Sequence, residues 1–407
     1  MSVGCRHTAA VIGCLVLFSS LLFAGWSAQT SGVMTDLTSV SFPEGTQVGY
    51  AVGNEGVILK TTDGGGTWVQ QTSGTGSGLY AVSFQNNSTG CAVGKSGTAI
   101  RTTDGGATWD TVSVGAATSL YAVQFVGTGG IGYACTHEPT GGSTLYKTTD
   151  AGASWQSAAL PGSGEQANCL SFASESIGFV AGLRGYAVKT IDGATNFGYM
   201  SPGVVRDFFG VGFVNNDAST AYVVGDSLTI VKTADTGTTW VRMSVNSPPD
   251  SAAALLSVCA PVSVGTAYAV GAGGLIVKNL GTTFWYPQVS GVTDRLLSVC
   301  FPNGNDTGYV VGAAGVILKT TDGGGVVGVG AGKELVVKRP AFTIASNPTR
   351  HGIMLLSDAD VNVVVFDAAG RTVTGRVAAK GGSFLPLSAG AYFVRAGAQT
   401  VRAVVTD

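Results

Sequence analysis

Residues 49–68 read GYAVGNEGVILKTTDGGGTW, and this stretch decides the fold. It contains a short apolar run, a glycine-containing turn, an alternating run, and a second turn that ends in tryptophan. Runs with period-two alternation that are bounded by turn residues are typical of β-strands, and no helical period competes with this pattern here. The stretch therefore predicts two strands, a tight turn and the start of a further strand.

The second turn is a box, Thr-x-Asp-x-Gly-x-Thr/Ser-Trp, that recurs along the chain. Intact copies occupy residues 61–68, 102–109, 148–155 and 233–240, and altered copies occupy 190–197, 278–285 and 320–326. The first five box aspartates follow one another at intervals of 41, 46, 42 and 43 residues. The characteristic box residues are Asp63, Trp68, Asp104, Trp109, Asp150, Trp155, Asp192, Asp235, Trp240 and Asp322. The chain therefore contains seven units.

Each unit begins with an apolar strand and continues with three more. The expected first strands are 37–42, 79–84, 120–125, 168–172, 208–213, 255–260 and 296–301. Four strands in each unit of roughly 40–45 residues, repeated seven times, are typical of a β-propeller. We therefore predict an all-β chain with a seven-bladed propeller over residues 25–325.

The residue types of the box favour a structural role. Its aspartate can accept hydrogen bonds from turn N–H groups, and its glycines can adopt positive φ. The Thr or Ser hydroxyl can complete this network, and the tryptophan offers a large apolar face to a neighbouring blade. We expect the boxes to hold blades together on the outside of the ring.

The N-terminal residues suggest how the ring closes. Residues 26–32 read WSAQTSG and match 68–74 and 285–291, which are expected to be fourth strands leading into the next unit. The seventh unit lacks a tryptophan-led fourth strand of its own after Gly325. We therefore predict that residues 26–32 pair with residues 316–321, which removes an exposed sheet edge.

The N-terminal residues indicate an exported protein, and the charge and the cysteines disfavour nucleic-acid partners and a disulfide framework. Residues 1–24 are typical of a signal peptide, with an apolar stretch too short to span a bilayer comfortably, so we expect no membrane span in the mature chain. Net charge is −2 without a basic run, which disfavours nucleic-acid partners. The five cysteines outside the signal are not spaced as a disulfide framework, although Cys259 and Cys300 occupy matching positions. We expect a monomer without cofactor or metal.

Residues 326–340 form a Gly/Val-rich connector, and residues 341–407 read as a second domain. Short β-rich runs and an Asp-x-x-Gly-Arg turn at 367–371 predict a small immunoglobulin-like β-sandwich. Such strands are generic, so a plain accessory sandwich is one interpretation of this domain.

Two resemblances add expectations. The boxes are similar to those of Asp-box (bacterial neuraminidase, or BNR, repeat) propellers, and the longer phrase of residues 51–68 resembles the photosystem II stability/assembly factor family. That resemblance implies a seven-bladed, non-enzymatic propeller. The Asn-Pro pair at 347–348, the 367–371 turn and the segment 389–395 resemble type IX secretion sorting domains, which implies export through residues 341–407 and processing after about Arg339.

Candidate functional residues lie where the units differ. Three aspartates precede first strands near the expected mouth of the central channel and could perform acid/base hydrolysis: Asp36, Asp207 and Asp294. The same carboxylates could instead cap turns. The third unit inserts residues 136–143 with His137, Glu138 and Pro139, and the degraded fourth unit offers Arg184, Tyr186, Tyr199 and Arg206.

These observations favour a secreted or cell-surface propeller that acts as a non-catalytic scaffold, with the periplasm as another location. We expect a protein partner first and a cell-surface glycan second, with the secretion machinery engaging residues 341–407. An Asp-box glycoside hydrolase acting on polysaccharide is the alternative function.

Overall fold

The computed structural model describes two parts of the chain. In the first part it describes residues 25–138, 142–162, 164–214, 217–246, 248, 250–261 and 266–325. In the second part it describes residues 343–344, 349–350, 352–356, 361–368, 371–378, 383–396 and 399–406. The predicted signal (1–24) and connector (326–340), with Pro139 and the Asn-Pro pair at 347–348, lie outside these residues. The chain divides into two compact units, Met1–Ala331 and Gly332–Asp407.

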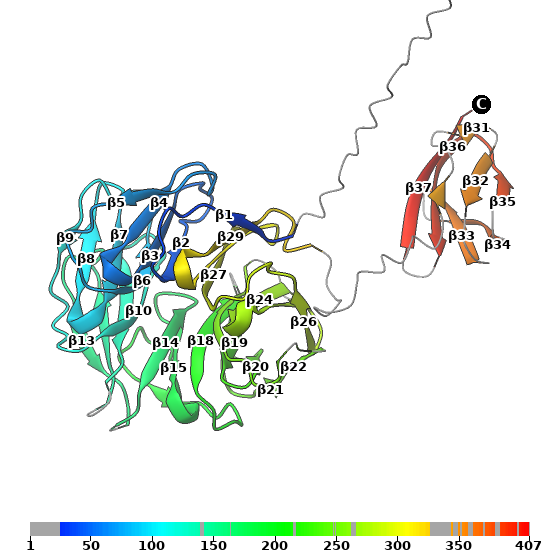
Figure 1. Cartoon of the computed structure of the whole chain (residues 1–407). Helices are drawn as coiled ribbons and strands as arrows, with labels where there is room; N and C mark the ends of the chain where they lie inside the picture. The colour runs from blue at the N-terminus through cyan, green and yellow to red at the C-terminus, as the bar shows by residue number, and fades with distance from the viewer. Residues whose placement is uncertain are drawn as a thin grey trace, which may run out of the picture. The chain divides into compact units, whose positions relative to one another are not determined.

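Unit 1 is a seven-bladed β-propeller, as the repeats predict (Figure 1). Blades 1 to 3 consist of β2 (Leu37–Ser41) to β5 (Val69–Gln71), β6 (Leu79–Phe84) to β9 (Asp110–Thr111), and β10 (Leu120–Val126) to β13 (Gln156–Ala159). Their middle strands are β3 (Gly49–Gly53), β4 (Ile58–Thr61), β7 (Gly90–Gly94), β8 (Ala99–Thr102), β11 (Ile131–Thr136) and β12 (Thr144–Thr148). Within each of these blades, neighbouring strands pair antiparallel in chain order.

Blades 4 to 6 follow the same order. They begin with β14 (Ala167–Phe172), β18 (Phe208–Val214) and β23 (Leu255–Cys259), and they end with β17 (Gly198–Tyr199), β21 (Val241–Arg242) and β26 (Phe284–Gln288). The middle strands are β15 (Gly178–Gly182), β16 (Ala187–Thr190), β19 (Asp217–Gly225), β20 (Thr229–Thr233), β24 (Thr266–Gly271) and β25 (Ile276–Leu280). Blade 6 has a fifth strand, β22 (Ser244–Val245), which pairs in parallel with β26.

Blade 7 closes the ring with a strand from the other end of the propeller. Its own strands are β27 (Leu296–Asn303), β28 (Thr307–Gly312) and β29 (Ile317–Thr320), and its fourth strand is β1 (Ser27–Gln29). Ser27, Ala28 and Gln29 pair antiparallel with Lys319, Leu318 and Ile317. The predicted pairing of residues 26–32 with the third strand of the seventh unit is therefore confirmed.

Packing between neighbouring blades forms the core. The first strand of each blade contacts the first strand of the next, and β27 contacts β2, so the first strands surround the axis. At the junction of blades 1 and 2, the Tyr50 ring stacks on Phe84 with centroids 3.6 Å apart, and Trp109 meets Phe84 edge-on. Phe42, Tyr309 and Trp68 form the same cluster between blades 7 and 1. The aromatic residues of each of these blades are therefore buried partly against the ring of a neighbouring blade and partly against their own tryptophan.

Unit 2 contains two small sheets, as a β-sandwich requires. One has the order β30 (Thr343–Ile344), β32 (Gly352–Leu356) and β35 (Ser383–Pro386). The other has the order β31 (Thr349–Arg350), β37 (Gln399–Thr406), β36 (Gly390–Ala396), β33 (Val361–Asp367) and β34 (Thr372–Ala378). Ile353 pairs with Leu385, Val365 pairs with Val394, and all four side chains are buried, so each sheet has an apolar inner face.

Two further observations concern the described residues. The five described cysteines are free, so Cys259 and Cys300 are not bridged. Within the same residues, no helix is long and apolar enough to cross a membrane.

Candidate functional site

Most of the candidate residues lie at one end of the propeller, where each blade is linked to the next. Because strands within a blade are antiparallel, the turn between strands two and three lies at the same end as the link to the next blade. Five of these turns are short 3-10 segments: η1 (Asn54–Gly56), η2 (Lys95–Gly97), η3 (Leu183–Gly185), η4 (Ala272–Gly274) and η5 (Ala313–Gly315). Their central residues have φ between 53° and 65°. Four of these central residues are not glycine, so neighbouring groups must hold them in the left-handed conformation.

Two of the three candidate catalytic aspartates supply that support. Asp36 accepts a hydrogen bond through Oδ1 from the backbone N–H of Ala314 at 3.0 Å, and Asp207 accepts one from Arg184 at 2.8 Å. In blade 3 the Ser119 hydroxyl oxygen accepts the equivalent bond from Ser96. A hydroxyl at the same place shows that this position does not need a carboxylate.

The third aspartate, Asp294, is exposed. None of the hydrogen bonds found among the described residues joins two of these three carboxylates. The structure therefore places two of the candidate acid/base groups in turn-capping roles and does not bring the three together through direct bonds.

A β-bulge recurs at the start of every first strand. The register of strands one and two shifts after the first residue in all seven blades, which leaves the second residue out of the ladder. Such bulges re-aim side chains. We call these seven residues the inner rim: Thr38, Tyr80, Tyr121, Asn168, Phe209, Leu256 and Leu297.

Part of the inner rim is fixed by polar contacts with the following blade. The Thr38 hydroxyl donates to the Leu79 carbonyl at 2.6 Å, and the Asn168 amide donates to the Phe208 carbonyl at 2.9 Å. Five of the seven rim side chains are aromatic or aliphatic. The inner rim is therefore an ordered and largely apolar ring on the innermost strands.

An aromatic arc occupies the rim over blades 2 and 3. The Tyr80 and Tyr121 rings lie 5.0 Å apart at 42°, and the Tyr121 and His137 rings lie 5.1 Å apart at 45°. Tyr121 is 41% exposed, whereas Tyr80 and His137 are half-buried. Burial is the main reason that the pKa of Tyr80 is raised. His137 was predicted from the sequence, whereas Tyr80 and Tyr121 were not; their signal is a Tyr after the leading Leu, which occurs in only two of the seven units.

Neighbouring groups hold His137 and Glu138, which belong to the insertion of blade 3, in place. His137 lies with Nδ1 at 3.3 Å from the Ala167 carbonyl, which can only accept, so Nδ1 carries a proton. The Thr118 hydroxyl donates to Oε1 of Glu138 at 3.1 Å, and the Thr136 hydroxyl lies 3.4 Å from the same oxygen. His137 is therefore part of the aromatic arc, and Glu138 is the next residue in the chain.

The predicted surface of the fourth unit is smaller than expected. Tyr186 is buried between blades 3 and 4, and its hydroxyl donates to the Pro161 carbonyl at 3.0 Å. Burial raises the pKa of this phenol. Arg184 and Arg206 are exposed, and Arg206 lies 4.0 Å from the Asp226 carboxylate. Arg184 and Arg206 are therefore open to solvent at this end of the propeller, and Tyr199 is exposed on the outer strand β17, whereas Tyr186 is not available to a ligand.

The box aspartates form closed turns. In blade 1, Asp63 accepts hydrogen bonds from the Thr61 hydroxyl and from both the N–H and the hydroxyl of Thr67, at 2.8 to 2.9 Å. These bonds, led by the Thr67 N–H, lower the pKa of Asp63 to about 2. The pKa is also lowered to about 2, with hydrogen bonds as the cause, at Asp104, Asp150, Asp192 and Asp235.

Each closed turn also receives contacts from the preceding blade. The Tyr50 hydroxyl and the Lys60 ammonium both donate to the Gly105 carbonyl of the second box, at 2.9 and 2.7 Å. The same paired contact joins blade 6 to blade 7 and blade 7 to blade 1. The boxes thus lie at blade junctions, where main-chain carbonyls receive buried donors.

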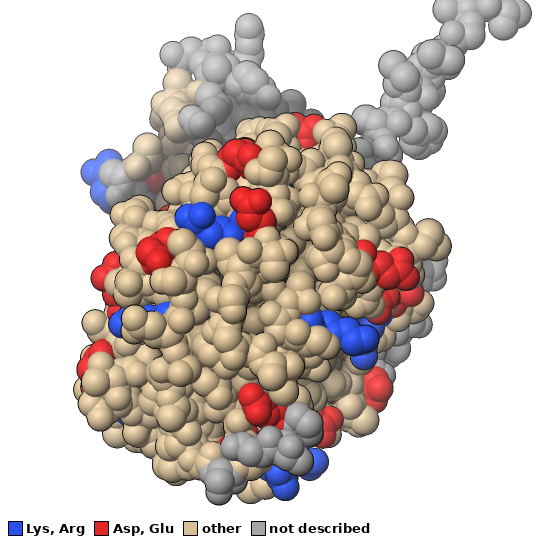
Figure 2. All heavy atoms as spheres, turned by 90° about the vertical axis from the view of Figure 1, so that its left-hand side faces the viewer, with Lys and Arg blue, Asp and Glu red and all other residues tan. Residues whose placement is uncertain are grey.

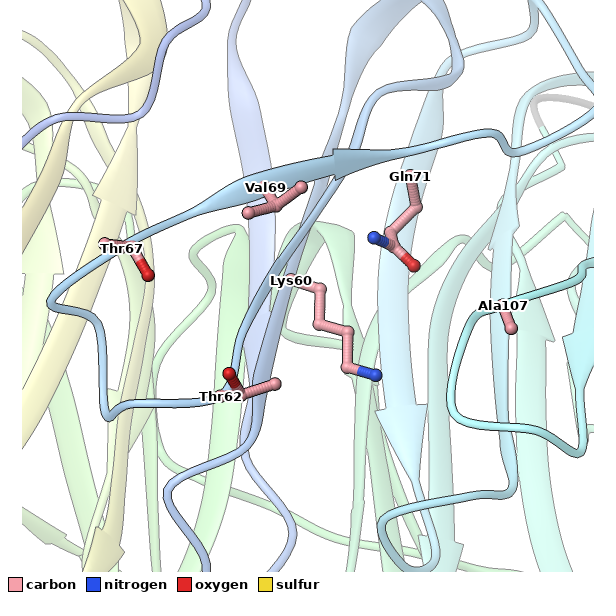
Figure 3. A pocket seen from close by; sticks show the side chains of 6 residues that line it. All are labelled: Lys60, Thr62, Thr67, Val69, Gln71 and Ala107. Carbon is pink, nitrogen blue, oxygen red and sulfur yellow. The ribbon is translucent and has the colours of Figure 1, made fainter.

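Two hollows are lined by residues other than those of the inner rim. One of about 240 Å³ lies beside Lys60, whose ammonium extends from β4 toward the box turn that carries Ala107 (Figure 3). The other, of about 420 Å³, is lined by the closing strand β1, residues 30–34, Val292 and residues 314–318. The first is built around a blade-to-blade contact and the second around the closing strand.

Charge is sparse on the described surface. Figure 2 shows the side that carries blades 2 and 3, where charged side chains stand singly or in small groups. The five propeller arginines do not form one patch, because Arg101 bonds the Ala151 carbonyl at a blade junction and Arg242 lies on the outer strand β21. Within the described residues, no group of three or more His, Cys, Asp or Glu side chains could hold a metal ion.

Comparisons with known proteins agree with the fold. A family model described as "Photosynthesis system II assembly factor YCF48" matches residues 19–169. The solved structure "YCF48 from Cyanidioschyzon merolae" is 21% identical, with a TM-score of 0.61, and the match covers 73% of this chain and 99% of that one. A second, "YCF48 bound to D1 peptide", is 19% identical, with a TM-score of 0.59, covering 73% of this chain and 97% of that one. No curated protein matches the sequence.

Proposed function

We propose that the propeller is a non-catalytic scaffold that binds a protein partner at the inner rim over blades 2 and 3. The observation that carries this proposal is the partly exposed Tyr121, which contacts Tyr80 on one side and His137 on the other. Rigid aromatic side chains dominate many protein interfaces because they bury much area at little entropic cost. The rim residues stand on paired strands, so binding would require little reorganisation.

The structural relatives support a protein-binding role for this fold. One of them is described as bound to D1 peptide, which is a property of that protein. The resemblance to assembly-factor propellers favours a non-enzymatic scaffold here as well. The contacts of Asp36 and Asp207 with neighbouring turns favour a structural use of these carboxylates over glycoside hydrolysis.

Site-specific photocrosslinking tests this proposal. Benzoylphenylalanine at position 121 should give a discrete protein adduct in cells that produce the full chain. The same group at position 199, a 62% exposed tyrosine on β17, is the matched control and should give none. Adducts of equal yield from both positions, or none from position 121, would show that the rim is not the binding site.

We further propose that the C-terminal unit serves export and that the propeller is secreted or displayed at the outer cell surface. The supporting feature is the 367–371 turn, in which Arg371 donates to Asp367 Oδ2 through its side chain and to Oδ1 through its backbone, at 2.7 and 2.9 Å. Asp367 and Arg371 connect β33 to β34, and their Asp-x-x-Gly-Arg sequence is the part that resembles sorting domains. Intact mass of the protein in the culture medium should correspond to a chain that ends near Arg339, whereas full-length or purely periplasmic protein would contradict it.

A further inference from the structure

We infer that the cluster of Tyr80, Tyr121, His137 and Glu138 receives a cationic side chain, Lys or Arg, from an extended segment of the protein partner. This inference rests on the proposed function and adds the chemistry of the ligand. It follows from three features of the cluster: its ring faces, its carboxylate and the charge around it.

The ring faces suit a cation. Lysine over tyrosine is already the repeated pairing of this propeller, since five ammonium groups lie 5.2 to 5.8 Å from a tyrosine centroid at blade junctions. Among the described residues, no cation lies over Tyr80 or Tyr121. Tyr121 is the more exposed of these two rings. A cation over its face would be attracted by the negative potential of the π-system.

The carboxylate of Glu138 is positioned before any ligand arrives. The Thr118 hydroxyl holds Oε1, and Oε2 has no hydrogen bond to another described residue. Glu138 forms no ion pair within the described residues, so its charge is uncompensated at short range. Glu138 follows His137 in the chain, and a carboxylate held by a neighbouring hydroxyl can give a Lys or Arg head group a charge-assisted hydrogen bond.

Charge at this end of the propeller favours the same ligand. Over blades 1 to 3, the turns and links between blades carry four carboxylates, on Asp36, Glu55, Glu138 and Glu165, against the single ammonium of Lys95. Over blades 4 to 7, the same turns and links carry four carboxylates, on Asp207, Asp226, Asp250 and Asp294, against three arginines, Arg184, Arg206 and Arg295. A basic residue of the partner is therefore favoured over blades 2 and 3. The inner-rim residues Phe209, Leu256 and Leu297 offer apolar contacts to the rest of the partner's extended segment.

Fluorescence anisotropy with labelled hexalysine, hexaarginine and hexaglutamate tests the inference on the full chain. The two basic peptides should bind and hexaglutamate should not. Tyr121→Ala should weaken the binding of the basic peptides about 5- to 30-fold, the range of one partly desolvated cation–π contact. Tyr121→Phe should stay within about twofold, because the ring face remains. Glu138→Gln should weaken binding several-fold and reduce its salt dependence.

Tyr199→Ala is the matched control, because Tyr199 is an exposed tyrosine on the outer strand of blade 4, and it should bind like the unmodified chain. Circular dichroism of each variant separates lost binding from lost folding. Equal affinity for hexalysine with and without the Tyr121 ring would overturn the inference, as would preferential binding of hexaglutamate or of a neutral oligosaccharide. A crosslinked protein partner at position 121 without any affinity for basic peptides would overturn the inference but leave the proposed function standing.

Discussion

Trp26 should be the side chain by which the N-terminal strand closes the propeller, and Trp26→Ala tests this. The indole is half-buried, meets Phe301 edge-on at 5.9 Å, and donates to Gln288 Oε1 at 3.1 Å. The Gln288 amide in turn donates to the carbonyls of Gly323 and Gly324 in the seventh box. Trp26 thus takes the place of the tryptophan that the seventh box lacks.

The expected loss follows from these contacts. Truncating a fully buried tryptophan costs about 3–5 kcal/mol, so a half-buried one should cost about 2 kcal/mol. The lost hydrogen bond adds about 1 kcal/mol. For a propeller of about 300 residues, a total of about 3 kcal/mol should lower the melting temperature by about 5 °C, measured by calorimetry. Trp26→Phe, which keeps a ring and loses only the indole N–H, should recover more than half of that loss.

Trp68→Ala is the matched control, because Trp68 makes the same edge-on contact with Phe42 at 6.1 Å inside blade 1. A permuted chain that places residues 25–32 directly after Gly325 is the second control. It should be at least as stable as the parent, because the same strand then completes blade 7 without a break. A Trp26→Ala variant that melts within 2 °C of the parent, while Trp68→Ala loses many degrees, would refute the reasoning.

Three further predictions concern the rest of the propeller. Lys60→Met should lower the free energy of unfolding in urea by about 1.5–3 kcal/mol, because Lys60 donates a hydrogen bond to the Gly105 carbonyl. Lys232→Met should lower it by less, because Lys232 contacts the Tyr222 ring without a hydrogen-bond acceptor among the described residues. Five box aspartates have a folded-state pKa of about 2, below the unfolded value of about 3.9. The stabilisation that they provide is therefore present above about pH 5 and should be lost as the pH falls toward 2. Circular dichroism against pH should show this loss, and Asp104→Asn should reduce the dependence of stability on pH. Arg184→Gly should raise the melting temperature slightly, because glycine adopts φ 55° without strain; a lower value would mean that the Arg184 side chain makes contacts worth more than this strain.

The sequence by itself determined the seven units, the order of strands and the closing strand. Each of these features can be read from a short segment of about ten residues: alternation and turn residues define a strand, and a leading tryptophan marks the segment 26–32 as a fourth strand. The limits of the first strands differ by only one or two residues in the structure: β14 begins at Ala167 where residue 168 was expected, and β27 ends at Asn303 where residue 301 was expected.

The tertiary structure alone decided where function can lie. Tyr80 and Tyr121 come together only because a bulge turns each out of its ladder and the ring sets their blades side by side. Asp36 caps a turn that is 278 residues away in sequence, and Tyr186 is buried by the neighbouring blade. Residue type and period do not report such contacts, because they depend on which blades meet after the ring has closed.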